Sequence, residues 1–293
     1  MKRPVVLIAG GVLLVAVALV ARNQYKVWRA HAGERAERAR IAELERRPIP
    51  EAVTKQRQLL LAELTPVTLE NCQLARFGGV NDGGYLMCLN LLDGIQSAYS
   101  YGIGTDDVWG CSVSLAFRVP VHEYDCFNPI KVACDGGTLR LNPECVGPRT
   151  ETIDGKPFDT LASQIAKNGD TGKRLVVKMD VEGAEWNSIL ATPDEVLDTI
   201  EQMPMELHGV DEPEVLAGLR KLKTHFHLLS VHWNNQACTK LSRPLPATAY
   251  QVLFVNKRIG RVGKPIPGSP TAASLLAPDA PWLKDCQAPS AVR

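Results

Sequence analysis

VVKMDVEGAEW, residues 176–186, is a short apolar run that ends in three acids, Asp180, Glu182 and Glu185. Its first residues are typical of a buried strand. Acids at the end of such a strand favour one of two structures. One is a helix N-terminus, where negative charge suits the helix dipole; the other is a ligand site at the carboxyl end of a parallel strand. The other strand ends of the chain separate these two interpretations.

Strand-like and helix-like segments alternate along most of the chain. The expected strands lie at residues 98–102, 119–124, 175–179, 202–207, 227–231 and 251–255. The expected helices lie at residues 108–117, 158–167, 185–191 and 213–223. This alternation predicts an α/β fold with a mainly parallel sheet that helices cover on both faces.

The N-terminus has a different composition. An apolar run from Val5 to Ala21 follows Lys2 and Arg3 and is closed by Arg22. The run is about 17 residues long, the short end of the range for a membrane-spanning helix. We therefore favour an uncleaved, single-pass membrane anchor over a cleaved secretory signal. Positive charge flanks the run on both sides, which leaves the side of the membrane open.

Four parts are expected along the 293 residues. Residues 1–22 form the transmembrane anchor or signal, and residues 23–66, rich in Ala, Arg and Glu, form a solvated helical stalk or linker. Residues 67–258 form the globular domain. Residues 259–293 form an irregular tail rich in Pro, Ala and Ser, which Trp282 or Cys286 could tie down.

Charge and cysteine content narrow the class of protein. The formal net charge is +1, which gives no sign of a nucleic-acid partner. The eight cysteines form no CxxC pair, so a zinc ribbon or a thioredoxin motif is not expected. Disulfides on an oxidising face of the membrane and buried free thiols both remain open. Cys134 with Cys145 is the most plausible disulfide.

The first two expected strands end in residues typical of a nucleotide site. YSYGIG, residues 99–104, places Gly102 and Gly104 between a strand and a helix, where glycine lets a ligand approach the backbone. HEYDCFNP places Asp125 at the next strand end, about 20 residues further on, the usual distance for an acid that binds ribose hydroxyls. The third glycine of the dinucleotide fingerprint is missing, which argues against NAD.

Two later strand ends carry ionisable residues as well. MPMELHG contains Glu206 and His208, and LLSVHWNN contains His232. Each such residue has a plain structural explanation: a helix cap for Asp180, a surface loop for Glu206, a satisfied core histidine for His232. The carboxyl ends of parallel strands lie side by side, however, so three polar strand ends in a row favour a ligand site.

These motifs resemble those of class I, S-adenosylmethionine-dependent methyltransferases of the FkbM-like and methyltransferase-like group. The matching stretches are NDGGYLMCLN, YSYGIG, HEYDCFNP, KMDVEGAEW, MELHG and YQVLFVNK, which span about residues 81–257. The resemblance implies a Rossmann-like, doubly wound, seven-stranded sheet with a final antiparallel hairpin. It also implies that the Gly102–Gly104 turn holds the cofactor, with Asp125 on its ribose. The loop GIGTDDVWG has fewer glycines than the usual motif.

The resemblance implies an enzyme that transfers a methyl group from S-adenosylmethionine. With the anchor expected from the apolar run, this enzyme would be membrane-anchored, and an oxygen of an unidentified small molecule or glycan is the expected acceptor. An alcohol acceptor needs a base within hydrogen-bond reach. The candidate catalytic residues are Asp180, Glu206, His208 and His232, and Asp180 and Glu182 are also candidates for binding the cofactor. A divalent metal is possible but not predicted, and the oligomeric state is open.

Two other functions fit the same residues. In a metal-dependent glycosyltransferase, Asp180 and Glu182 would form an acid-x-acid metal site that Glu206 with His208 or His232 completes. The reduced glycine loop alternatively favours a catalytically silent, membrane-tethered binding module. Chelator treatment and a comparison of sugar nucleotide with S-adenosylmethionine would separate these functions.

Overall fold

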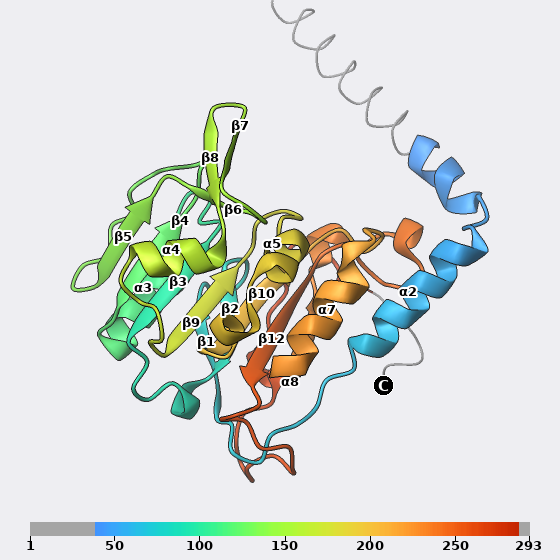
Figure 1. Cartoon of the computed structure of the whole chain (residues 1–293). Helices are drawn as coiled ribbons and strands as arrows, with labels where there is room; N and C mark the ends of the chain where they lie inside the picture. The colour runs from blue at the N-terminus through green and yellow to red at the C-terminus, as the bar shows by residue number, and fades with distance from the viewer. Residues whose placement is uncertain (1–38, 287–293) are drawn as a thin grey trace, which may run out of the picture. The chain divides into compact units, whose positions relative to one another are not determined.

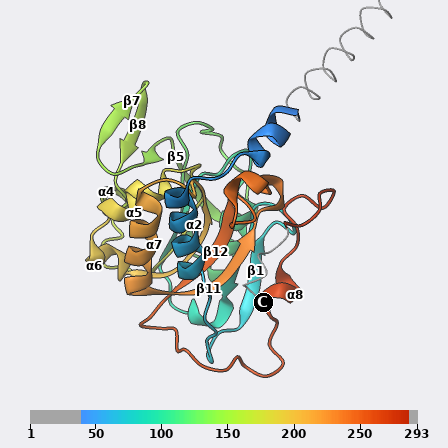
Figure 2. The ribbon, with the colours of Figure 1, turned by 90° about the vertical axis from the view of Figure 1, so that its right-hand side faces the viewer.

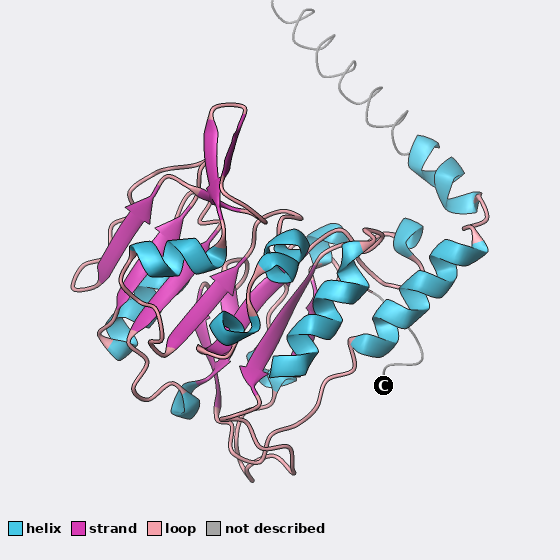
Figure 3. Cartoon of the chain, viewed as in Figure 1, coloured by secondary structure: helices cyan, strands magenta, loops and turns pink. Residues whose placement is uncertain are grey.

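A seven-stranded, mostly parallel sheet forms the centre of this mixed α/β fold (Figures 1 and 3). The computed structural model describes residues 39–286. The strand order is β11-β12-β10-β9-β3-β4-β5. The strands are β3 (Ser97–Tyr101), β4 (Pro120–Tyr124), β5 (Thr138–Asn142), β9 (Leu175–Met179), β10 (Ile200–Leu207), β11 (Phe226–Trp233) and β12 (Tyr250–Asn256). Only β12 runs antiparallel to its neighbours in this sheet, β10 and β11.

The sheet buries both faces because its central strands are apolar on both sides. In β9, Leu175, Val177 and Met179 belong to one hydrophobic cluster, and Val176, between Leu175 and Val177, belongs to the other. The first cluster includes side chains of α2 (Glu51–Glu63), α4 (Leu161–Lys167), α5 (Glu185–Ala191) and α7 (Glu214–His225). The second includes side chains of α3 (Val108–Phe117) and of the hairpin β1 (Leu74–Gly78) and β2 (Gly84–Cys88).

The six expected strands are confirmed, with ends that differ by no more than two residues, and the helices at 108–117 and 185–191 have the expected bounds. The expected helix at 158–167 begins three residues later, because its first residues belong to β8 (Lys156–Asp159). The sequence reasoning missed β5, the β1–β2 hairpin and a small sheet. That small sheet consists of β6 (Cys145–Val146), β7 (Glu151–Ile153) and β8. The remaining short helices are α6 (Asp194–Leu197) and α8 (Ala272–Leu275).

All eight cysteines form disulfides, in the pairs Cys72–Cys88, Cys111–Cys134, Cys126–Cys145 and Cys238–Cys286. The expected pair Cys134–Cys145 is wrong. The extended strand β5 lies between these two cysteines, and its five residues span roughly 16 Å. A disulfide requires α-carbons within about 7 Å, so the two ends of this strand bond to different partners.

Part of the expected stalk belongs to the folded unit, which begins at Pro50 and not at residue 67. Leu60 of α2 is fully buried, and α2 packs beside α7 (Figure 2). The guanidinium of Arg57 pairs with Asp211 at 2.6 Å and donates to the carbonyl of Leu241. Before Pro50, the described part of the chain is helical at residues 39–46.

The tail after residue 258 returns to the domain. Asp279 and Ala280 are buried, and Cys286 is bonded to Cys238, while Trp282 is 79% exposed. The disulfide, and not the tryptophan, therefore holds the tail. Within residues 39–286 no helix is long and apolar enough to cross a membrane. The apolar run Val5–Ala21, expected to be an anchor, lies outside the described residues.

Candidate functional site

Two cavities meet at the carboxyl edge of the sheet, between β3 and β9. The chain leaves β3 toward β4 and leaves β9 toward β10, in opposite directions along the sheet. One cavity, about 330 Å³, is lined by Asp82, Tyr85, residues 102–109, Lys178 and Asp180. The other, about 390 Å³, is more apolar and is lined in part by Tyr124, Asp125, Phe127, Val146 and Phe158. The cavities share Gly102, Gly104 and Asp180.

The glycine turn approaches the end of β9 so closely that Gly102 admits no side chain. Gly102 has φ +74°, and a Cβ there would lie 1.7 Å from the carbonyl oxygen of Asp180. Gly104 also has a positive φ, +60°, but a Cβ there would meet nothing within 4 Å. The first glycine is therefore required by packing, whereas the second leaves room for a ligand.

Asp125 holds this turn. Its Oδ2 accepts from the backbone N–H groups of Ile103 and Gly104 at 3.2 and 3.3 Å, and its Oδ1 accepts from those of Phe127 and Asn128 at 2.8 and 2.7 Å. The side chain is buried, with 8% of the residue exposed, and lines the second cavity. Asp125 thus links the turn after β3 to the loop after β4. The disulfide Cys126–Cys145 lies beside the second cavity, since Cys145 also lines it.

Two residues of the first cavity were missed by sequence reasoning. Lys178 is buried in β9, and its Nζ donates to the carbonyls of Tyr101 and Gly102 and lies 3.6 Å from Asp180 Oδ2. The hydroxyl of Tyr85 donates to the same Oδ2 at 3.0 Å. A lysine inside the apolar run at 176–179, and a tyrosine inside the quoted NDGGY motif, were the available signals.

The acids after β9 have different roles. Glu185 begins α5 as expected, but it is fully buried and its carboxylate accepts from the N–H groups of Val181 and Gly183. The same carboxylate lies 3.0 Å from His208 Nδ1. Glu185 therefore holds both the loop and the His208 ring in place from a buried position. This role goes beyond the expected one of a negative charge at the start of a helix.

Asp180, Glu182 and His208 each offer one ligand atom, and these atoms all lie within 4.8 Å of one another. His208 Nε2 is 3.6 Å from Glu182 Oε2 and 3.9 Å from Glu206 Oε1. Burial lowers the pKa of His208, but the carboxylates of Glu185, Glu206 and Asp180 outweigh it and raise the pKa to about 9. Burial, together with the charge of Asp180, raises the pKa of Glu206 to about 7.

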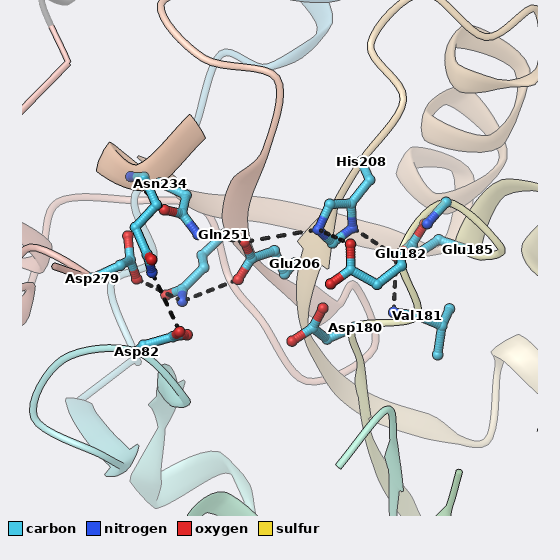
Figure 4. A network of polar contacts seen from close by, with 12 residues as sticks. Asp82, Asp180, Val181, Glu182, Glu185, Glu206, His208, Asn234, Gln251 and Asp279 are labelled. Atoms are coloured by element: carbon cyan, nitrogen blue, oxygen red, sulfur yellow. Dashed lines mark hydrogen bonds and ion pairs between the residues drawn. The ribbon is translucent and has the colours of Figure 1, made fainter. Parts of the chain in front are cut away.

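A second polar network extends from Glu206 across the sheet (Figure 4). In the register of the sheet, Glu206 lies opposite Gln251 of β12, and Gln251 lies opposite His232 of β11. Asn234 donates to Glu206 Oε1 at 2.7 Å, and Gln251 donates to Asp279 at 3.1 Å. His232 Nε2 lies 3.2 Å from Asp279 Oδ2. Asp279 comes from the tail, where no motif had marked it.

The structure thus brings four expected residues together, Asp180, Glu182, Glu206 and His208. Gly102, Gly104 and Asp125 line the neighbouring cavities. In the part of the chain that the structure describes, His232 is connected to this group through Asp279 and Gln251.

One more buried pair supports the first cavity. Asp107 accepts from the N–H of Gly110 at 2.7 Å and caps α3. Glu123 of β4 is 1% exposed. Burial, with the adjacent charge of Asp107, raises the pKa of Glu123 to about 8. A neutral Glu123 carboxyl therefore lies against the helix cap beside the glycine turn.

No protein-family model matches the chain, and no curated protein matches it.

Proposed function

We propose that the chain is an S-adenosylmethionine-dependent methyltransferase with a Rossmann-like, doubly wound fold, and that its acceptor is an oxygen of a small molecule or glycan. The observation that carries the proposal is the pair of cavities that share Gly102, Gly104 and Asp180. S-adenosylmethionine has a charged aminoacyl end and an uncharged adenosine end with a flat aromatic base. A polar cavity that adjoins a more apolar one fits such a two-part ligand.

The strand order supports the same proposal. Ligands of open α/β sheets bind where neighbouring strands send the chain in opposite directions, which here is between β3 and β9. The methyltransferase resemblance implies seven strands with a final antiparallel hairpin. The position of β12, antiparallel between β10 and β11, is consistent with that.

Asp125 and the aromatic residues of the second cavity would bind the adenosine. The two bonds of Asp125 Oδ2, at 3.2 and 3.3 Å, are longer than those of Oδ1, so Oδ2 is the oxygen that we expect to accept from ribose hydroxyls. Phe127 and Phe158 offer apolar surface to the base. In the first cavity, Lys178 offers a cation and Asp82 an anion for the aminoacyl end.

Asp180 is the residue that we expect to act on the acceptor. It lines both cavities, so its carboxylate lies where the two ends of the cofactor would meet. Bound cofactor supplies a methyl group activated by a sulfonium, and the protein must place the acceptor oxygen beside it and take its proton. His208 and Glu206 line neither cavity, and His232 is engaged by Asp279.

Calorimetry of the full chain with S-adenosylmethionine and its demethylated product tests the proposal. Both should bind. Asp125→Ala should weaken binding, because the ribose hydroxyls lose a charged acceptor worth roughly 1.5–3 kcal/mol. Asp93→Ala, an exposed aspartate that lines neither cavity, is the matched control and should bind like the wild type. Equal affinity in wild type and Asp125→Ala would remove Asp125 from the site.

A sugar nucleotide with Mn²⁺ is the comparison ligand in the same experiment. If it binds and S-adenosylmethionine does not, the chain is a glycosyltransferase-like enzyme. If a folded sample binds neither, the catalytically silent module is favoured. A single-pass anchor at residues 1–22 remains part of the proposal.

A further inference from the structure

The carboxyl ends of β9 and β10 bring together three side chains of the kinds that bind metal ions. Asp180 follows β9, Glu182 lies in the next loop, and His208 follows β10. Their ligand atoms lie within 4.8 Å of one another (Figure 4). Two carboxylate oxygens and one imidazole nitrogen form a mixed donor set that suits divalent cations such as Mn²⁺ or Zn²⁺.

The His208 ring is held from outside this set. Its Nδ1 lies 3.0 Å from the carboxylate of Glu185, which is fully buried. The opposite nitrogen, Nε2, faces Glu182 at 3.6 Å and Glu206 at 3.9 Å. A histidine that ligates a metal through one nitrogen usually donates its other N–H to a carboxylate, which fixes the ring. Glu185 is such a partner: it fixes the His208 ring and is not itself one of the three ligands.

Glu185 also fixes the second ligand. Its two oxygens accept from the N–H groups of Val181 and Gly183, the residues on either side of Glu182. One buried carboxylate therefore orients both the imidazole and the loop that carries Glu182. The side chain of Glu182 itself is 87% exposed, so it can move toward an ion without disturbing the core.

The charge around His208 is unbalanced. Four carboxylates, those of Asp180, Glu182, Glu185 and Glu206, contact two cationic side chains, His208 and Lys178. With all six groups ionised, four negative and two positive charges leave −2. Buried carboxylates are costly unless they are paired or bind a metal. Glu185 is fully buried and Glu206 is 5% exposed, so a cation at this position would lower that cost.

We propose that Asp180, Glu182 and His208 bind one divalent cation, with Glu185 as the residue that positions the site. Lys178 and Tyr85 both contact Asp180 Oδ2, so Oδ1 is the oxygen that we expect to face the ion. Ligand–metal bonds of about 2.0–2.2 Å require the three ligand atoms to close together by roughly 1 Å. The exposed Glu182 loop can supply that movement. Both this proposal and the methyltransferase proposal assign a role to Asp180, but the cation is tested without cofactor, so the failure of one is distinguishable from the failure of the other.

The test is metal binding by the full chain after chelator treatment, with Mn²⁺ alone as the probe. Electron paramagnetic resonance measures free Mn²⁺, and calorimetry with Mn²⁺, Zn²⁺, Mg²⁺ and Ca²⁺ gives affinity and stoichiometry. We expect one site per chain. Glu182→Gln should weaken binding at least ~10-fold, and Glu185→Gln by ~10- to 100-fold, the usual effect of losing a partner of a ligating histidine.

Glu195→Gln is the control for Glu182→Gln, since both are exposed glutamates and Glu195 lies outside the cluster. It should bind Mn²⁺ like the wild type. Because Glu182 is exposed, its variant should fold, and a melting curve verifies this. Absence of stoichiometric binding of either Mn²⁺ or Zn²⁺ to the folded wild type overturns the proposal. So does binding that Glu182→Gln and Glu185→Gln leave unchanged.

Discussion

The two halves of the carboxyl edge are built in different ways. Around β3, β4 and β9, side chains bond mainly to backbone groups: Asp125 accepts from N–H groups of the glycine turn, and Lys178 donates to the carbonyls of Tyr101 and Gly102. Around β10, β12 and β11, side chains bond to one another, and Asn234, Gln251 and Asp279 come from separate segments. The first half depends on local chain geometry and the second on tertiary packing. Variants that alter one half test this difference.

Gly102→Ala should have the largest effect, because it acts on the first half through the backbone. A Cβ at this position would lie 1.7 Å from the carbonyl oxygen of Asp180, which cannot move without displacing β9. We expect a loss of ~4 kcal/mol or more in the free energy of unfolding. Chemical denaturation measures it.

Gly104→Ala is the control two residues away. It has a positive φ but open space around the added Cβ, so only the backbone cost of about 1–2 kcal/mol is expected. Equal losses in the two variants would mean that the turn does not approach β9 as described.

Removal of α2 should cause the next largest loss of stability. It should affect the second half, around β10, β11 and β12. Arg57 bonds to Asp211, in the loop after β10, and to the carbonyl of Leu241, after β11. Loss of residues 1–66 should cost roughly 3 kcal/mol, since it exposes the surface covered by Leu60 and Leu64. Loss of residues 1–47 keeps α2 and should leave the melting temperature unchanged. If both truncations melt alike, α2 does not stabilise the domain.

Asp279→Ala tests the second half directly. The Asp279 side chain is fully buried and contacts Gln251 and His232, so its removal leaves both without this partner. An unsatisfied buried polar group costs about 1–3 kcal/mol, and thermal unfolding should show a loss of this size. Asp285→Ala, an exposed tail residue before the same disulfide, should be neutral. A neutral Asp279→Ala would show that the tail is not part of the network.

The sequence could predict the first half because its residues directly follow strands. Gly102, Gly104, Asp125 and Asp180 each lie within a few residues of a strand end. The carboxyl ends of parallel strands share an edge, so their proximity follows from the fold class alone. Short apolar runs that alternate with helix-like segments also located the strands themselves.

In the second half, Glu206, His208 and His232 lie at or near strand ends and were predicted in the same way, but their partners were not. Asp279 lies 47 residues after His232, in a segment whose composition is that of an irregular tail, and the disulfide to Cys238 that holds it has no local signal. Glu185 has the position of an ordinary helix-dipole acid, and only its burial reveals that it orients His208. The pairing Cys134–Cys145 failed because the short strand β5 was not recognised.

Glu123→Gln is expected to have an effect that depends on pH. Glu123 lies against Asp107, which caps α3 beside the first cavity, and burial with that charge raises its pKa from the ordinary 4.5 to about 8. The folded state therefore holds a proton that the unfolded chain releases. This contribution to stability is fully present below pH 4.5, declines as the pH rises and is lost above about pH 8.

Glutamine is neutral at every pH and has nearly the same shape, so Glu123→Gln lacks this pH dependence. The stability of the variant relative to wild type should rise across pH 5–8, by at most about 1.4 kcal/mol per pH unit, and then level off. Denaturation at pH 5, 6, 7, 8 and 9 measures the difference, and Glu195→Gln, an exposed glutamate, should show no comparable trend. A flat difference for Glu123→Gln would mean that Glu123 is ionised in the folded protein. The helix cap beside the glycine turn would then carry two negative charges instead of one.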